Sequence, residues 1–265
     1  MINKFYTLLI FAFVAFYIAQ MLLEFYYALK KFYIKHTTPI ILLPEDKQFL
    51  ENHVDFYKNL SSKEKNVFED KIKIFLKNYE IIGVDIKITP QDKLLVAASG
   101  TIPVFRFKTW YYPNLHKIYL FDDSFSYLGP GVPKDTKVNG LVGKGFLGGK
   151  MYLSRKALYN GFKKINKGKN TGIHEFLHLI DMEDGTMDGI PETLLGKYSY
   201  KPWLNLIENE IQRICNETTI LSDYACSNAT EFFAETGVHF FEKPEELKKN
   251  HPQLYDLLYQ IFMTK

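Results

Sequence analysis

The stretch that decides the fold is GIHEFLHLID, which runs from Gly172 to Asp181. It contains the pattern His174-Glu175-x-x-His178, in which two histidines lie four positions apart. On a helix this spacing puts both imidazoles on one face, about 6 Å apart along the axis, so that both can bind one metal ion. Glu175 lies about 100° around the helix, where its carboxylate can accept a proton from water at an open coordination position. The pattern therefore predicts a catalytic zinc site on one helix.

The positions between these polar residues favour a real metal site over a chance match. They are filled by large apolar side chains, namely Phe176, Leu177, Leu179 and Ile180. A helix that is apolar almost all round is expected to be buried. Two histidines and a glutamate on one buried turn are costly without a strong partner, and a divalent cation is the simplest partner that satisfies them.

A tetrahedral catalytic zinc ion needs a third protein ligand. The metzincin pattern does not supply it, because Asp181 and Asp184 stand where that pattern has glycine and histidine. A second buried helix is predicted downstream, where Glu231 and Glu235 lie four positions apart and share a face. One of these carboxylates can bind the metal while the other holds a ligating histidine. We expect Glu231 to be the third ligand.

With these residues the chain resembles the zinc-dependent peptidases of the Mlc titration factor A family. The resemblance extends from about Leu43 to the C-terminus and includes the segments Leu94–Phe105, Gly140–Ser154 and Phe240–Pro244. The active-site residues alone also resemble those of the catalytic domain of anthrax lethal factor. Both are gluzincin-type enzymes, which bind one zinc ion per chain through HExxH and a distal glutamate.

The resemblance implies a role for each residue of the site: His174, His178 and Glu231 as zinc ligands, Glu175 as the general base and Tyr224 as a hydrogen-bond donor to the developing oxyanion. Asp181 and Glu235 would be partners of the ligating histidines. A carboxylate at the position of Asp181 could equally be a surface charge at the end of its helix. The role of Tyr224, one of 18 tyrosines, follows from the resemblance alone.

The expected function is hydrolysis of peptide bonds in a peptide or protein substrate. One alternative is a regulatory binding protein, because the family takes its name from sequestering a transcriptional repressor. A zinc hydrolase that acts on other bonds would use the same ligands. A formal net charge of +3 without a recognised binding motif speaks against nucleic acid as a partner. Cys215 and Cys226 lack metal-site spacing and do not require a disulfide.

The N-terminal segment Phe5–Leu23 is a run of 19 uncharged, mostly apolar residues. Such a run can span a bilayer core of about 30 Å as a helix, and it has no convincing signal-peptide cleavage site before Glu24. It predicts a single-pass membrane anchor in contact with the lipid bilayer, with a cleaved signal peptide as the rival. Lys30, Lys31 and Lys35 follow the segment and favour a cytoplasmic catalytic domain.

The predicted organisation is a membrane anchor and juxtamembrane segment at residues 1–36, followed by one peptidase domain at residues 37–265. The pattern predicts an α+β fold with the zinc-site helices in the C-terminal half. Expected strands include one marked by Val84, Ile86 and Ile88, one near residues 102–107 and one at residues 117–121. A strand at Gly149–Leu153 is the expected platform for an extended substrate, although a plain core hairpin fits the same residues.

Overall fold

A computed structural model describes residues 13, 16–26, 30, 38–126, 136–143, 148–192, 194–195, 200–216 and 220–264. The chain divides into two compact units, Met1–Ile41 and Leu42–Lys265. In the first unit, residues 16–26 are helical and their side chains are exposed. The second unit carries the sheet, the buried core and the site residues.

The prediction of a membrane anchor at Phe5–Leu23 is wrong. In the ranges that the structure describes, no helix is both long and apolar enough to cross a membrane. Residues 5–12, 14 and 15 of the predicted span lie outside the described residues. Three further predictions rested on this span: a single-pass membrane location, its cytoplasmic orientation and a lipid partner. They are withdrawn together with the anchor.

The sheet of the second unit has four strands in the order β1-β2-β6-β5. Their bounds are β1 Glu80–Gly83, β2 Leu115–Phe121, β6 Gly149–Ser154 and β5 Gly140–Val142. The first three strands are parallel, and β5 pairs with β6 in the antiparallel direction. Two short strands, β3 (Phe125–Ser126) and β4 (Lys137–Val138), form a separate antiparallel pair. Strand β5 therefore forms one edge of the main sheet, and β6 is paired on both sides.

The helices of the second unit are α2 Pro44–His53, α3 Asp55–Lys58, α4 Ser62–Asn78, α5 Pro90–Thr101, α6 Arg155–Gly161, α7 Thr171–Asp181, α8 Tyr200–Asn216, α9 Ala229–Glu242, α10 Pro244–Asn250 and α11 Pro252–Met263. Short 3-10 turns lie at Lys164–Asn166, Met182–Asp184 and Asp223–Cys226. Proline at the first helical position starts four of these helices, where its missing N–H costs no hydrogen bond.

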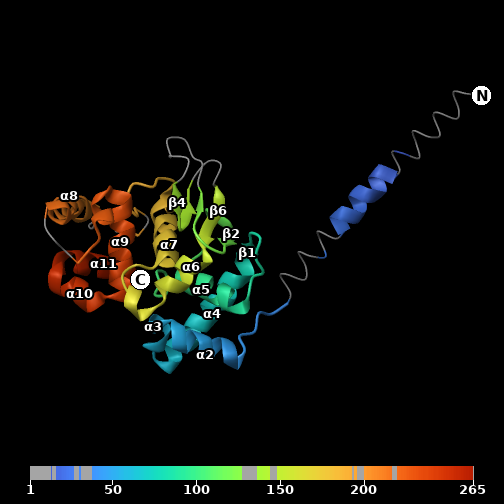
Figure 1. Cartoon of the computed structure of the whole chain (residues 1–265), viewed down its shortest axis with the longest axis horizontal. Coiled ribbons are helices and arrows are strands. Elements are labelled where there is room, and N and C mark those ends of the chain that lie inside the picture. The colour runs from blue at the N-terminus through green and yellow to red at the C-terminus, as the bar shows by residue number, and fades with distance from the viewer. Residues whose placement is uncertain are drawn as a thin grey trace, which may run out of the picture. The chain divides into compact units, whose positions relative to one another are not determined.

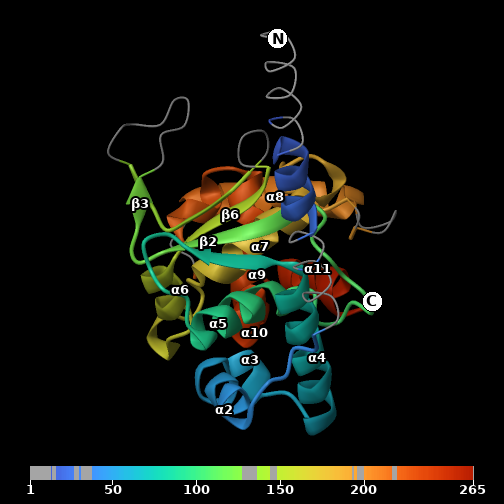
Figure 2. The ribbon, with the colours of Figure 1, turned by 90° about the vertical axis from the view of Figure 1, so that its right-hand side faces the viewer.

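Helix α7 lies between the sheet and the group formed by α8, α9, α10 and α11 (Figure 1). It packs against α5, α6 and α9 and also touches β5 and β6. Seen from the side, α7 and α9 lie behind β2 (Figure 2). The inner sheet face contributes Ile118, Leu120, Met151 and Leu153, all buried, to the core beneath α7. The central helix is therefore held on several sides by apolar contacts.

The predicted α+β class is corrected to a mixed α/β arrangement. Three parallel strands need crossover connections, and α5 provides one of them between β1 and β2. The strand expected around Val84, Ile86 and Ile88 is absent, because Asp85 has a φ of 57° and breaks the extended backbone. Residues 102–107 form a turn flanked by bends instead of the expected strand. The strand expected at residues 117–121 is present within β2.

Candidate metal centre

Helix α7 is positioned by its first turn. Asn170 is the N-cap, and its Oδ1 accepts a hydrogen bond of 3.1 Å from the backbone N–H of Ile173. The apolar positions of the helix are buried as its sequence requires. His174 and His178 therefore project from one face of a helix whose remaining faces are fixed in the core.

Helix α9 is set against α7 by a cap and a close contact. The Oδ1 of Asn228 accepts a hydrogen bond of 2.9 Å from the N–H of Glu231, which fixes the first turn of α9. At Gly237 a side chain would meet the Leu177 side chain at 2.7 Å, so glycine lets the two helices approach closely. This approach brings Glu231 from α9 to the histidines of α7.

Three ligand atoms converge between the two helices. The Nε2 atoms of His174 and His178 are 3.0 Å apart, and the Oε2 of Glu231 lies 3.1 Å from the first and 3.5 Å from the second. A tetrahedral zinc ion with bonds of about 2.0–2.1 Å separates its ligand atoms by roughly 3.3–3.4 Å. The three residues therefore fit a single ion, and they form a group of metal-ligand type within the described residues.

Glu235 holds the far side of His174. Its Oε1 lies 3.1 Å from the Nδ1 of His174, and its Oε2 accepts a hydrogen bond of 2.7 Å from the Ser222 hydroxyl. A carboxylate on Nδ1 fixes the ring orientation and leaves Nε2 free to bind a cation. Glu231 and Glu235, one turn apart, thus contact the two nitrogens of the same imidazole.

The electrostatics of this group depend on burial and on charge pairing. Burial acts to lower the pKa of His174, but its hydrogen bonds with Glu231 and Glu235 raise it to about 10. Burial acts to raise the pKa of Glu231, but the two histidines hold it well below its usual range. Because a metal binds only unprotonated imidazole, metal binding here is expected to release protons.

Glu175 lies in a cleft of about 480 Å³ together with His174 and Tyr224. It is buried, and this burial raises the pKa of its carboxyl group, although both nearby histidines act to lower it. The carboxylate lies against β5, where a side chain on Gly140 would come within 2.3 Å of Oε1. The cleft therefore presents a buried carboxylate with a raised pKa beside the group that could bind a metal ion.

The family model that matches this chain covers residues 30–263 and is described as glucose-regulated metallo-peptidase M90. The chain belongs to the M90 metallopeptidase family. It is also similar to an uncharacterized protein, slr2042, of Synechocystis sp. (strain ATCC 27184 / PCC 6803 / Kazusa), with 30% identity over 234 residues and 82% of each chain covered. Membership of a metallopeptidase family implies a metal ion, and the histidine and glutamate group between α7 and α9 is able to bind one.

Tyr224 lies at the mouth of the cleft in this M90 chain. It is 55% exposed, and its ring centroid lies 6.2 Å from that of His174. Partial burial and the neighbouring Glu231 raise its pKa to about 12, so the hydroxyl keeps its proton at neutral pH. The hydroxyl is protonated and hydrogen-bonded to Glu231, so it lies beside the group that could bind a metal ion.

Asp181, at the end of α7, is completely buried, which excludes the surface charge considered from sequence. Its Oδ2 accepts a hydrogen bond of 2.9 Å from the N–H of Gly189. Its Oδ1 and the Nδ1 of His178 are both buried without a hydrogen-bond partner in the described structure. Burial raises the pKa of Asp181 to about 7. The aspartate is thus placed near His178, but no direct hydrogen bond joins them.

Three residues of the site were missed by the sequence analysis. Asn170 caps the metal helix, Ser222 supports Glu235, and Gly140 makes room for Glu175. The first carries a readable signal, because asparagine just before an apolar helix is a common cap. Ser222 and Gly140 act through contacts with residues on other elements of the fold, and no sequence pattern predicts such contacts.

Proposed function

We propose that this M90 metallopeptidase is a gluzincin-type zinc peptidase that hydrolyses peptide bonds with a water activated by Glu175. The observation that carries the proposal is the convergence of His174 Nε2, His178 Nε2 and Glu231 Oε2 at separations of 3.0–3.5 Å. Two imidazoles and one carboxylate are typical of catalytic zinc, which keeps an open coordination position. A zinc ion in this set would supply Lewis-acid polarisation to the substrate carbonyl and to the attacking water.

The protein residues would then divide the proton transfer and charge stabilisation between them. Glu175 accepts the proton of the attacking water and delivers it to the leaving amine, a role favoured by its raised pKa. Tyr224 donates its hydroxyl to the carbonyl oxygen as negative charge develops there. Glu235 orients His174, and Asp181 sets the electrostatic environment of His178 from within the core.

The cleft also supports a peptide or protein as the substrate. Its lining includes residues Lys137–Gly140, which lead from β4 into the edge strand β5. An edge strand has unpaired backbone groups that can pair with an extended peptide. The strand expected to do this from sequence, Gly149–Leu153, lies inside β6, whose two sides are already paired. We therefore assign the substrate platform to β5.

The proposal is tested by replacing the base while keeping the ligands. Glu175→Gln should retain one zinc per chain by elemental analysis and lose about 10²- to 10⁴-fold in turnover on an unbiased peptide library. Glu208→Gln, which changes an exposed glutamate on α8, is the matched control and should keep full turnover. Undiminished cleavage by Glu175→Gln, or wild-type protein that does not retain zinc, would reject the mechanism.

The same variant distinguishes hydrolysis from the alternative function, a regulatory protein that binds and sequesters a partner. A protein that acts only by sequestering a partner does not need the base, so Glu175→Gln would leave its cellular role intact. Nothing in the described residues favours that alternative over hydrolysis. The group His174, His178 and Glu231, with His174, Glu175 and Tyr224 lining one cleft, supports an enzyme.

A further inference from the structure

A second cavity of about 780 Å³ lies beside the metal helix and shares no lining residue with the catalytic cleft. Helix α7 contributes Ile173 to this cavity, whereas the next two residues, His174 and Glu175, face the cleft. Small-molecule sites in proteins have volumes of about 300–1,000 Å³. The second cavity is therefore large enough for an organic ligand, and residues of α7 line both it and the catalytic cleft.

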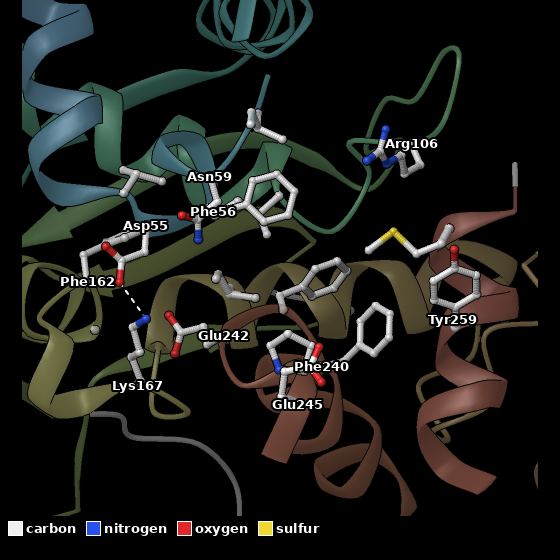
Figure 3. Close-up of a pocket in the computed structure, with 18 of the residues that line it drawn as sticks. Asp55, Phe56, Asn59, Arg106, Phe162, Lys167, Phe240, Glu242, Glu245 and Tyr259 are labelled. Carbon is white, nitrogen blue, oxygen red and sulfur yellow. Dashed lines mark ion pairs between the residues drawn. The ribbon is translucent and has the colours of Figure 1, made fainter. Parts of the chain in front are cut away.

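Six aromatic side chains form much of the wall: Phe56, Phe162, Phe240, Phe241, Tyr255 and Tyr259. They come from α3, the end of α6, the end of α9 and α11. Figure 3 shows Asp55, Lys167 and Glu242 near one end of the space and Arg106 and Tyr259 near the other. Such a wall favours a ligand with an apolar body, and ring faces also attract cations.

The two basic side chains of the cavity already have carboxylate partners. Lys167 pairs with Asp55 at 2.6 Å, the dashed contact in Figure 3, and Arg106 pairs with Glu64 at 2.8 Å. Because both basic side chains are already in ion pairs, neither is available to pair with a carboxylate or phosphate of a ligand. An anionic ligand would therefore have to break an existing ion pair, which makes an anion a poor occupant.

Two acidic side chains of the cavity, Glu242 and Glu245, make no ion pair within the described residues, and Glu242 is the less exposed of the two. Its two oxygens accept hydrogen bonds from neutral donors, the N–H of Gly168 at 2.6 Å and the Nδ2 of Asn170 at 3.0 Å. Within the described part of the chain it makes no ion pair at contact distance. Burial raises its pKa to about 7, although these donors and the charge of Lys167, which is paired with Asp55, oppose the shift. A cation placed beside this carboxylate would offset the cost of its burial.

We propose that this cavity binds a small organic ammonium compound, with its charged nitrogen at Glu242 and its apolar or aromatic body against the six rings. The charge of the ligand follows from the unpaired carboxylate and the two occupied basic groups. Its apolar body follows from the wall. A bare metal ion does not fit this space, because the only lining carboxylates without an ion pair among the described residues are the half-buried Glu242 and the exposed Glu245, and hard cations need several oxygen ligands.

Three matched probes test the charge requirement on the 265-residue chain. 2-Phenylethylamine carries the ammonium group, 2-phenylethanol is neutral, and 3-phenylpropanoate is anionic. We expect the amine to bind about tenfold more tightly than the alcohol in calorimetric titrations, since a charge-assisted hydrogen bond is stronger than a neutral one. The carboxylate should bind more weakly still. Equal affinity for amine and alcohol, or tighter binding of the carboxylate, would overturn the proposal.

Methionine methyl NMR locates the probe without relying on peptidase activity. Met263 lines the cavity, whereas Met182 and Met187 follow α7, and the carbonyl of Met187 contacts Thr230 beside the metal ligand Glu231. The amine should shift the Met263 resonance, assigned with Met263→Leu. Shifts of Met182 or Met187 without a shift of Met263 would place the amine elsewhere and reject the site.

Two variants complete the test. Glu242→Gln should reduce amine affinity about tenfold and leave alcohol affinity unchanged, because the lost interaction is ionic. Leu60→Trp, which narrows the cavity and spares Glu242, should abolish the Met263 shift even if Glu242→Gln folds poorly. Glu208→Gln is the control for exposed charge and should bind like the wild type. Unchanged amine binding in both cavity variants contradicts the proposal.

Discussion

Glu231 and Glu242 lie about three turns apart on α9, in surroundings that shift their pKa values in opposite directions. Burial acts to raise both values. At Glu231 the histidines of α7 reverse this effect and hold the pKa well below its usual range. At Glu242 the hydrogen-bond donors are a backbone N–H and an amide, and burial prevails to give a pKa of about 7.

The comparison teaches that the charge of the partner, more than the number of hydrogen bonds, decides the state of a buried carboxylate. Glu231 faces nitrogens that can carry a proton or bind a metal, so its negative charge is balanced in either case. Glu242 faces donors that cannot change their charge. One end of α9 therefore contributes to a group that could bind a metal ion, and the other end carries the carboxylate for which we propose a cationic ligand.

Removing the charge from Glu231 should give the largest effect. Glu231→Gln takes away one of the three proposed metal ligands and replaces it with a weak one, so zinc affinity should fall by more than the 10- to 100-fold typical of residues that only support a ligand. Turnover should fall with it. Zinc competition against a chelator of known affinity measures the first effect, and a peptide digest at saturating zinc measures the second.

Glu242→Gln is the matched control on the same helix. It removes a carboxylate of similar burial that does not touch the metal ligands, so zinc affinity should stay within about threefold of the wild-type value. Equal weakening of zinc binding by the two variants would contradict the claim that Glu231 binds the metal and Glu242 does not.

The residues that the sequence predicted best are those whose geometry is local. Spacings of four positions placed His174 with His178 and Glu231 with Glu235, and helical periodicity alone puts each pair on one face. Burial of the apolar positions around them followed from the same pattern. The expectation that the two helices meet came from zinc chemistry, because a catalytic zinc ion needs a third protein ligand.

The features that the sequence could not provide depend on contacts between distant segments. The order of the strands is set by pairing between β1, β2, β5 and β6, so the sequence could not show that β6 is an inner strand. The partners of Glu242 lie more than 70 positions earlier in the chain. The alternation of Val84, Ile86 and Ile88 imitated a strand, but it carries no information on the left-handed backbone of Asp85.

A smaller effect is expected in the pH dependence of folding. Because the folded pKa of Glu242 is raised from 4.5 to about 7, the folded protein holds more protons than the unfolded chain between these values. Its stabilising contribution is complete below pH 4.5 and is lost as the pH rises to about 7. The free energy of unfolding of Glu242→Gln should therefore rise relative to the wild type by about 2–3 kcal/mol across this range.

Urea unfolding of both proteins with a chelator present, at pH 4.5 to 8, measures this difference. Asp181 and the metal ligands are unchanged in the variant, so their own titrations cancel when the two curves are subtracted. Glu242→Asp keeps an ionisable group at the site and should retain most of the slope. A difference that stays constant with pH would show that Glu242 ionises normally in the folded protein.

Of the two carboxylates that contact His174, Glu235 should have the smaller effect, because it touches the proposed metal site through one histidine. Glu235→Gln keeps an oxygen near the Nδ1 of His174 but removes the charge that orients and polarises the ring, so zinc affinity should fall by about 10- to 100-fold. Ser222→Ala removes only a hydroxyl from the other carboxylate oxygen and should cost less than tenfold. If Glu235→Gln weakened zinc binding as much as Glu231→Gln, Glu235 would itself be a metal ligand, and the division of roles on α9 would have to be reversed.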